Sequence, residues 1–276
     1  MNKNELGAAL RALRLASGKE AKAVARSAVM SPSKLSKIEN GALSASPADV
    51  DRILSALGVS DEVRAEYMSA ARAASTEATA WRLLRRTGIY KAQHRTRALE
   101  AAMRELKLFQ PALVPGLLQT PEYIRAVLAR HDLPEESMAR TMAARIDRQS
   151  VLYEAGRTLR FVITEPVLRW RIVSVGMMAA QLDRIISMSR LPNVDIRVVP
   201  LSSVQSDIAN HAFVIRDDNT VTVETVHAEL VVSDPRDVSL YVRKFDGFAE
   251  MAVAGDTMRS MIEGIRDEFL REQESD

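Results

Sequence analysis

The stretch SPSKLSKIENG, residues 31–41, has the features of a short helix with a defined start and end. Ser31 suits the N-cap, and the proline after it suits the first helical position, where a missing N–H costs nothing. Leu35 and Ile38 are three residues apart, so they lie on one face. Gly41 can take the left-handed conformation that commonly ends a helix. The stretch therefore predicts a helix with one buried face and one lysine-bearing face.

Further helical patterns surround this stretch within residues 1–75. Apolar residues recur at helical spacing from Leu6 to Leu13, and a Ser-Gly pair follows them as an end signal. KEAKAVARSA (19–28) gives a second short helix, and two more helices are expected from Pro47 to Leu57 and from Asp61 to about Ala74. Five short helices with tight connections predict a compact all-α domain.

This order of features resembles the helix-turn-helix domain of the lambda-repressor and XRE family, through LRALR (10–14), VARSAVMS (24–31) and SPSKLSKIENG. The resemblance implies that the last of these holds the recognition helix, which enters the major groove of DNA. Its implied base contacts are Pro32, Ser33 and Lys37, and Ser31 belongs to the same DNA-binding set. Its implied phosphate contacts are Lys19, Lys22, Lys34 and Asn40. The resemblance also implies that Arg14 and Glu39 form a structural brace between the first helix and the recognition helix.

The chemistry of these residues agrees with DNA binding. Lys37 can donate to guanine acceptors and Ser33 can pair with several bases, while lysines on phosphates give affinity without sequence preference. The alternative is that Lys34 and Lys37 form an ordinary solvated face. We favour DNA binding because the cap, the helix end and the five-helix context agree with it.

Two positions depart from the family pattern. Val29 stands in the turn where the family usually has glycine, so we expect a turn conformation that a β-branched residue tolerates. Ala21 stands where the family often has glutamine, so one DNA contact is expected to be missing.

Charge divides unevenly along the 276 residues, although the net charge is only +2. Residues 1–110 hold 19 Lys and Arg against 11 Asp and Glu, and the remainder holds 19 against 25. A basic front half indicates contact with a polyanion. The chain has no cysteine and no apolar run long enough for a membrane helix, so we expect a cytoplasmic, nucleoid-associated protein that does not contact membranes.

A basic connecting segment is expected over residues 76–98. AARAASTEATA (70–80) is small and polar, which suits a domain boundary or a loosely packed helix end. The sequence WRLLRRTGIYKAQHRTR that follows could extend the phosphate footprint or pair with the acidic half, and charge alone does not choose between these.

Residues 99–276 combine helical and strand patterns. Leu99 to Phe109 is amphipathic, and Thr120 is the expected N-cap of a helix that begins at Pro121. Stretches rich in β-branched residues predict strands at 158–164, 194–200, 211–217 and 220–226, and Asp-Asp-Asn between the last two indicates a hairpin. The predicted fold class is mainly α and multidomain, with an α+β C-terminal domain in which helices cover a small sheet.

Several motifs of this half, above all LVPGLLQTPEY, resemble the C-terminal domain of actinobacterial XRE-type regulators described as WhiJ-like or antitoxin-like. The resemblance implies a transcriptional regulator paired with a small protein encoded alongside it. We also expect a homodimer, because such domains commonly read two half-sites. Residues proposed for a partner or ligand site are Gln119, Tyr123, Arg148 and Gln149.

The alternative for this half is a pocket that senses a small molecule. An enzyme fused to the DNA-binding domain is a third reading, disfavoured because the sequence has no phosphate loop, nucleophile elbow or metal-ligand pair. We expect no catalytic residue, cofactor or metal.

Overall fold

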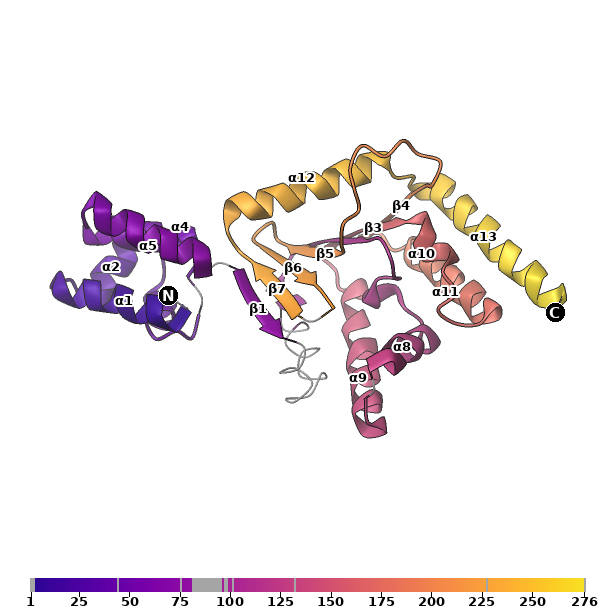
Figure 1. The fold of residues 1–276 in the computed structure, drawn as a ribbon, viewed down its shortest axis with the longest axis horizontal. Coiled ribbons are helices and arrows are strands. Elements are labelled where there is room, and N and C mark those ends of the chain that lie inside the picture. Colours follow the sequence, from indigo (N-terminus) through magenta and orange to yellow (C-terminus); the bar gives the residue numbers. More distant parts are fainter. Residues whose placement is uncertain are drawn as a thin grey trace. The chain divides into compact units, whose positions relative to one another are not determined.

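The computed structural model describes residues 3–43, 45–74, 76–80, 96, 99–100, 102–131, 133–226 and 228–275 (Figure 1). The chain divides into two compact units. The first comprises Met1–Ala78 with Leu230–Ser239, and the second comprises Thr79–Glu229 with Leu240–Asp276. Most of the expected basic segment, residues 81–95 and 97–98, lies outside the described residues.

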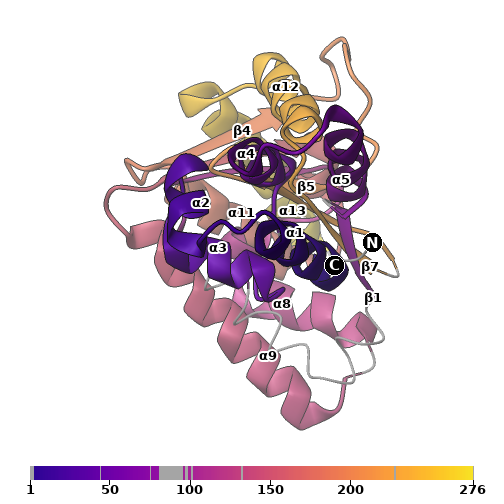
Figure 2. The ribbon, with the colours of Figure 1, turned by 90° about the vertical axis from the view of Figure 1, so that its left-hand side faces the viewer.

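All five predicted N-terminal helices are present in the first unit (Figure 2). They are α1 (Lys3–Ala16), α2 (Ala21–Ser27), α3 (Pro32–Glu39), α4 (Pro47–Leu57) and α5 (Asp61–Ala74). The Ser31 hydroxyl accepts from the Lys34 N–H at 3.1 Å, and Ser46 forms a capping box with Asp49. Gly41 and Gly58 follow their helices at φ 69° and 72°. Local capping chemistry therefore sets these helix ends.

The core of the first unit joins α1 closely to α3. Leu10, Leu35 and Ile38 are almost fully buried in one apolar cluster. A Cβ added at Gly7 would lie 2.2 Å from the Ile38 carbonyl oxygen, so the two helix backbones approach closer there than any other residue allows. This contact holds the position of α3 in the unit.

The described strands form one mixed sheet, and most of its residues belong to the second unit. Its strands are β1 (Thr76–Ala80), β2 (Glu105–Gln110), β3 (Thr158–Thr164), β4 (Val194–Val199), β5 (Phe213–Arg216), β6 (Thr220–Glu224) and β7 (Ala228–Val232). Their order is β1-β7-β6-β5-β2-β3-β4. Strands β2, β3 and β4 are parallel, whereas β5 runs antiparallel to both β2 and β6.

Helices cover both faces of this sheet (Figure 1). They are η1 (Gly116–Leu118), α8 (Pro121–Leu128), η2 (Ala129–His131), α9 (Glu135–Arg148), η3 (Gln149–Tyr153), α10 (Glu165–Arg169), α11 (Val175–Met188), α12 (Pro235–Met251) and α13 (Gly255–Ser275). Phe161 packs in one cluster with Leu182 of α11 and Ile262 of α13. On the opposite face, Phe109 stacks on Phe248 of α12 at 4.0 Å between ring centroids.

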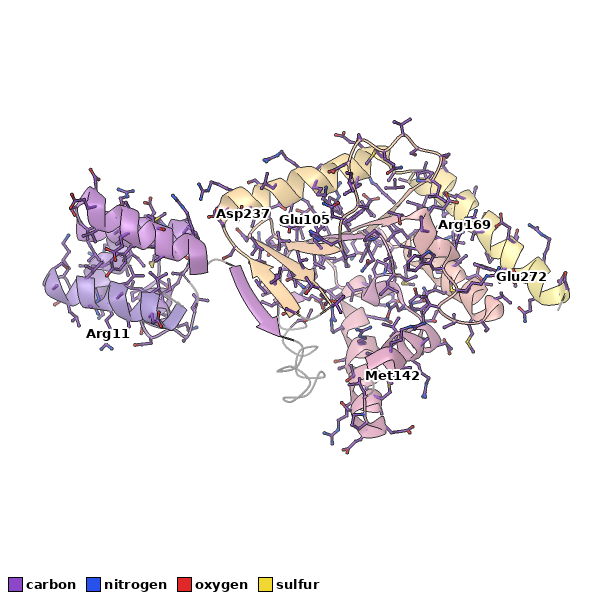
Figure 3. All side chains as sticks on the ribbon, viewed as in Figure 1. Arg11, Glu105, Met142, Arg169, Asp237 and Glu272 are labelled. Carbon is purple, nitrogen blue, oxygen red and sulfur yellow. The ribbon has the colours of Figure 1, made fainter. Side chains whose placement is uncertain are left out.

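Charged pairs join α13 to the segment after β3. Arg169 donates to Glu268 at 2.7 Å, and Arg171 makes two hydrogen bonds to Glu272 at 2.5 and 2.7 Å. Figure 3 labels Arg169 and Glu272, which lie on the outer side of this unit. These pairs supplement the apolar contact between α11 and α13.

The four predicted strands are confirmed, and so is the hairpin. Asp217 and Asp218 have φ values of 51° and 49°, and the Asn219 N–H donates to the Arg216 carbonyl at 2.9 Å, as in a type I′ turn. The amphipathic stretch 99–109, however, ends in strand β2, and residues 76–80 form strand β1 instead of a helix end. The sheet therefore has more strands than the four predicted. Strand β2 was not predicted because it contains Lys107, and a lysine is not expected in a central strand. Here the lysine is 6% exposed and pairs with Asp218 at 2.8 Å.

Candidate nucleic-acid interface

One side of α3 is fixed to the rest of the first unit. Arg14 donates from Nε to Oε1 of Glu39 at 2.6 Å and from Nη2 to Oε2 at 2.8 Å. Both side chains are nearly buried, and the hydrogen bond to Glu39 raises the pKa of Arg14. The expected brace is thus a bidentate ion pair, which locks the end of α3 to α1.

The opposite side of α3 faces solvent. Its exposed residues are Pro32, Ser33, Ser36, Lys37 and Asn40. The side chain of Lys37 has no hydrogen bond or ion pair within the described part of the chain, and the same holds for the exposed side chains of Lys22 and Arg26 in α2. Three cations of the helix-turn-helix segment are therefore available for an anion. Ser36 and Arg26 were not predicted from the sequence as DNA contacts, although each lies one helical turn from a predicted contact, Ser33 or Lys22.

Two other lysines proposed for phosphates are engaged inside the unit. The Lys19 ammonium donates to the carbonyl oxygens of Ala56 and Leu57 at 2.8 and 3.1 Å, which satisfies the last turn of α4. Lys34 donates to Asp49 at 2.8 Å. This geometry favours a structural role for both lysines, because a phosphate contact would require each to give up its partner.

Asp49 links α3 to α4 as an ion-pair centre. Burial by itself would raise the pKa of this carboxyl, but hydrogen bonds from Lys34 and Arg52 lower it below its ordinary value. Arg52 donates to the same oxygen at 2.6 Å, and the Asp49 side chain is 5% exposed. The carboxylate is therefore held ionised in the unit.

The turn between α2 and α3 differs from what the sequence suggested. Val29 has φ 54°, so its backbone is in the left-handed region. A β-branched residue is strained in this conformation. The side chain is 80% exposed. The expectation of a turn conformation that a β-branched residue tolerates was wrong, because the turn places Val29 at positive φ.

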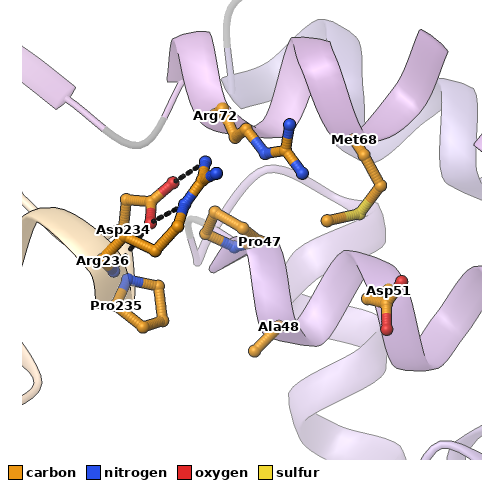
Figure 4. A pocket seen from close by; sticks show the side chains of 8 residues that line it. All are labelled: Pro47, Ala48, Asp51, Met68, Arg72, Asp234, Pro235 and Arg236. Carbon is orange, nitrogen blue, oxygen red and sulfur yellow. Dashed lines mark hydrogen bonds and ion pairs between the residues drawn. The ribbon is translucent and has the colours of Figure 1, made fainter. Parts of the chain in front are cut away.

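A small hollow also lies in the first unit (Figure 4). It measures about 240 Å³, and its lining residues are Pro47, Ala48, Asp51, Met68, Arg72, Asp234, Pro235 and Arg236. Asp234 accepts from the backbone N–H of Arg236 at 2.9 Å and pairs with its guanidinium at 3.4 Å. Asp51 pairs with Arg64 at 2.6 Å. Both carboxylates of the hollow therefore have partners within the unit.

In the second unit, the four residues proposed for a partner or ligand make internal contacts. Gln119 donates to the Val114 carbonyl at 2.7 Å, and Gln149 donates to the Gln119 carbonyl at 2.8 Å. Tyr123 is fully buried, with its hydroxyl accepting from the Val114 N–H at 3.4 Å. Arg148 makes a bidentate ion pair with Glu100, at 3.0 and 2.5 Å.

These contacts hold the segment before α8 in place. Gln181 of α11, which the sequence analysis missed, completes them by accepting from the Thr120 N–H and donating to the Leu118 carbonyl, each at 2.8 Å. Because Gln119, Tyr123 and Gln149 are buried, a partner cannot reach them in this conformation. The geometry favours a structural role for all four proposed residues.

The described residues contain neither a candidate metal cluster nor a candidate membrane-spanning helix. They contain no group of three His, Cys, Asp or Glu side chains that could hold a metal ion. None of their helices is both long and apolar enough to cross a membrane. His211 lies beside Phe213 and Tyr241, and its Nδ1 contacts the Ala212 carbonyl at 3.1 Å. That histidine is therefore a packing residue, while His94 and His227 lie outside the described residues.

Two protein-family models match the chain. A helix-turn-helix domain model matches residues 5–67, and a domain of unknown function, DUF5753, matches residues 93–264. The chain belongs to the DUF5753 family. No curated protein matches it. The helix-turn-helix match covers the whole of α1 to α4 apart from the first residues, so the DUF5753 chain carries a domain of the kind found in DNA-binding regulators.

Solved structures give distant likenesses. Nuc from Salmonella typhimurium, a phospholipase D family member, is 11% identical with a TM-score of 0.38, over 66% of this chain and 97% of its own. TrmBL2, an archaeal chromatin protein, is 14% identical with a TM-score of 0.33, over 66% and 53%. NucT from Helicobacter pylori is 14% identical with a TM-score of 0.35, over 65% and 98%. At these TM-scores, none supports an inference about the function of the DUF5753 chain.

Proposed function

We propose that this chain is a sequence-specific DNA-binding transcriptional regulator. The observation that carries the proposal is the division of α3 into two sides. Glu39 and the close contact at Gly7 fix one side to α1, while the other side presents Ser33, Ser36 and an unpaired Lys37. A helix held rigidly with a free polar face meets the requirement for reading base edges in the major groove.

The phosphate contacts that we propose are narrower than the sequence indicated. The side chains of Lys22 and Arg26 in α2 are exposed and have no partner among the described residues, so they can contact the DNA backbone without losing an internal interaction. Lys19 and Lys34 instead stabilise the unit through Leu57 and Asp49. We assign base contact to Lys37 with the two serines, and phosphate contact to Lys22 and Arg26.

Selection of duplexes from a random library with the full chain tests this function. We expect an enriched motif, and we expect Lys37→Ala to weaken binding to it by roughly 1–3 kcal/mol while relaxing one base position. Lys244→Ala is a matched control, since this lysine lies in the second unit and pairs with Asp207. Absence of any enriched duplex at low salt would contradict the proposal.

For the second unit we propose a dimerisation and partner-binding role, with the partner a small protein encoded alongside, as in the WhiJ-like, antitoxin-like regulators that the sequence resembles. Two copies would place two α3 helices on half-sites about one helical turn apart. Purification of the full chain from its native host, followed by mass measurement of the intact complex, should give two copies with a stoichiometric small protein. A chain that remains a monomer without such a protein would contradict this role.

A sensor of small molecules is the alternative role for the second unit. A polar hollow of about 390 Å³ lies beside Ser189, Arg190, Asp256 and Arg259. However, Asp256 is 96% exposed and already pairs with Arg259 at 2.6 Å, whereas small-ligand pockets are usually enclosed and mostly apolar. We therefore favour the protein partner. A bound metabolite in the intact complex, with no protein partner, would reverse this preference.

A further inference from the structure

Val29 combines an unfavourable backbone conformation with a side chain that the described residues leave exposed. Its φ of 54° lies in the left-handed region, where a β-branched residue is strained. Its side chain is 80% exposed, so the strain brings no burial in return. Its N–H donates to the Arg26 carbonyl at 3.2 Å, a bond that glycine would make equally well. The described residues therefore give the valine side chain no burial that offsets the strain, which points to a contact with a bound molecule.

Val29 lies close in sequence to the exposed face of α3, which we call the reading face because we propose that it contacts the bases. It precedes the N-cap Ser31 by two residues, and the exposed Pro32 follows at the first helical position. Early residues of a recognition helix are those that approach base edges. At the start of α3, Val29 and Pro32 therefore add apolar exposed surface, before and after the exposed cap Ser31 in the sequence.

The remaining chemistry of the reading face makes this apolar surface important. Ser33 and Ser36 pair with any base, and Lys37 is the one long cation on the exposed face of α3 as the structure describes it. Asn40 is the C-cap at the far end, and its amide donates to the Ser36 hydroxyl at 3.4 Å. The described face thus has no arginine or glutamine for a two-point contact to guanine or adenine. Discrimination beyond that given by Lys37 needs another source.

We propose that Val29, with Pro32 beside it, contacts the C5-methyl group of a thymine in each half-site. Thymine is the base that presents a methyl group in the major groove, and apolar side chains recognise it by contact. This inference rests on the proposed function and adds to it one specificity-determining residue. It also explains why a strained valine occupies a turn that glycine would fill without strain.

The test uses the full chain and the duplex selected from the random library. Each thymine of a half-site is replaced in turn by deoxyuridine, which removes the methyl group and leaves the hydrogen-bonding edge unchanged. We expect one replacement to weaken binding about fourfold, the value of one buried methyl group. For Val29→Gly we expect equal affinity for the two duplexes, both at the level of the wild-type chain on the deoxyuridine duplex.

Two controls separate base contact from other effects. Glycine adopts positive φ without strain, so Val29→Gly should fold at least as well as the wild-type chain, as circular dichroism during heating would show. Val204→Gly changes another valine, 91% exposed in the second unit, and should leave the fourfold difference intact. If no thymine replacement matters, or if Val29→Gly retains the difference, the inference is overturned while DNA binding stands. If no duplex is enriched, the proposed function fails as well.

Discussion

At the scale of single residues, Gly7 decides how closely α1 and α3 pack. A Cβ there would lie 2.2 Å from the Ile38 carbonyl, and backbone on both sides leaves little freedom to relax. We expect Gly7→Ala to destabilise the first unit by roughly 2–3 kcal/mol through overpacking. Hydrogen exchange of the α1 and α3 amides measures this unit separately from the second.

The matched control for Gly7 is its neighbour Ala8, which is exposed on the same helix. Ala8→Ser should change the same exchange rates little, because it meets solvent and costs only a small helix propensity. Equal exchange in Gly7→Ala and the wild-type chain would show that α3 can shift outward freely, contrary to the packing described above.

The Arg14–Glu39 pair sets the second residue-scale expectation. Arg14→Ala leaves the Glu39 carboxylate, 7% exposed, without its bidentate partner. Removal of one member of a buried pair costs about 3 kcal/mol, so α3 amides should exchange much faster. Arg64→Ala breaks an ion pair with Asp51 in the same unit, but that pair is about 40% exposed and should contribute less than about 1 kcal/mol. Similar losses in the two variants would refute this ranking.

At the scale of helices, Asp49 makes the attachment of α4 to α3 dependent on pH. Its folded-state pKa is lowered, chiefly because hydrogen bonds from Lys34 and Arg52 overcome the effect of burial. The stabilisation is therefore complete above the unfolded pKa of about 3.9 and is lost as pH falls through the lower folded value. We expect Asp49→Asn to cost roughly 1–2 kcal/mol at pH 7.

The stability of the Asp49→Asn variant at low pH tests the sign of this pH dependence. Once the pH has fallen through the lowered folded-state pKa of Asp49, the wild-type carboxyl carries its proton and the two proteins should approach equal stability in denaturant titrations. A stability difference that stays constant from pH 7 down to the acid unfolding of the wild-type chain would mean that the carboxylate charge contributes nothing.

In the second unit, Gln181 connects α11 to the segment before α8. It is fully buried and satisfies the Thr120 N–H and the Leu118 carbonyl together. Gln181→Leu would leave both backbone groups unpaired, so we expect a loss of roughly 2–4 kcal/mol in chemical unfolding followed by tryptophan fluorescence. Gln273→Leu on the exposed face of α13 should be nearly neutral, and a comparable loss there would argue against the hydrogen-bond explanation.

At the scale of the whole molecule, charge distribution governs the salt dependence of DNA binding. The slope of log K against log salt concentration is negative, and each lost phosphate contact reduces its magnitude by about 0.9. We expect that decrease for Lys22→Ala and for Arg26→Ala. For Lys19→Ala we expect an unchanged slope and a less stable first unit, because its ammonium caps α4. A slope of reduced magnitude for Lys19→Ala would instead return this lysine to the phosphate contacts.

The sequence by itself predicted the features that short-range chemistry sets. The ends of α3 and α4 follow from Ser31, Ser46 and Gly58, because caps and left-handed glycines act within one helical turn. The four predicted strands follow in the same way from runs of β-branched residues. The brace from Arg14 to Glu39 came from family resemblance and is present.

Tertiary structure decided which polar residues remain free. Lys19, Lys34, Gln119 and Gln149 looked available in the sequence, but carbonyls and carboxylates distant along the chain occupy them. Strand β2 was hidden for the same reason, since the charge of Lys107 is neutralised by Asp218, 111 residues later. Helix and strand periodicity depends on near neighbours, whereas the partner of a charged group depends on how the whole fold packs.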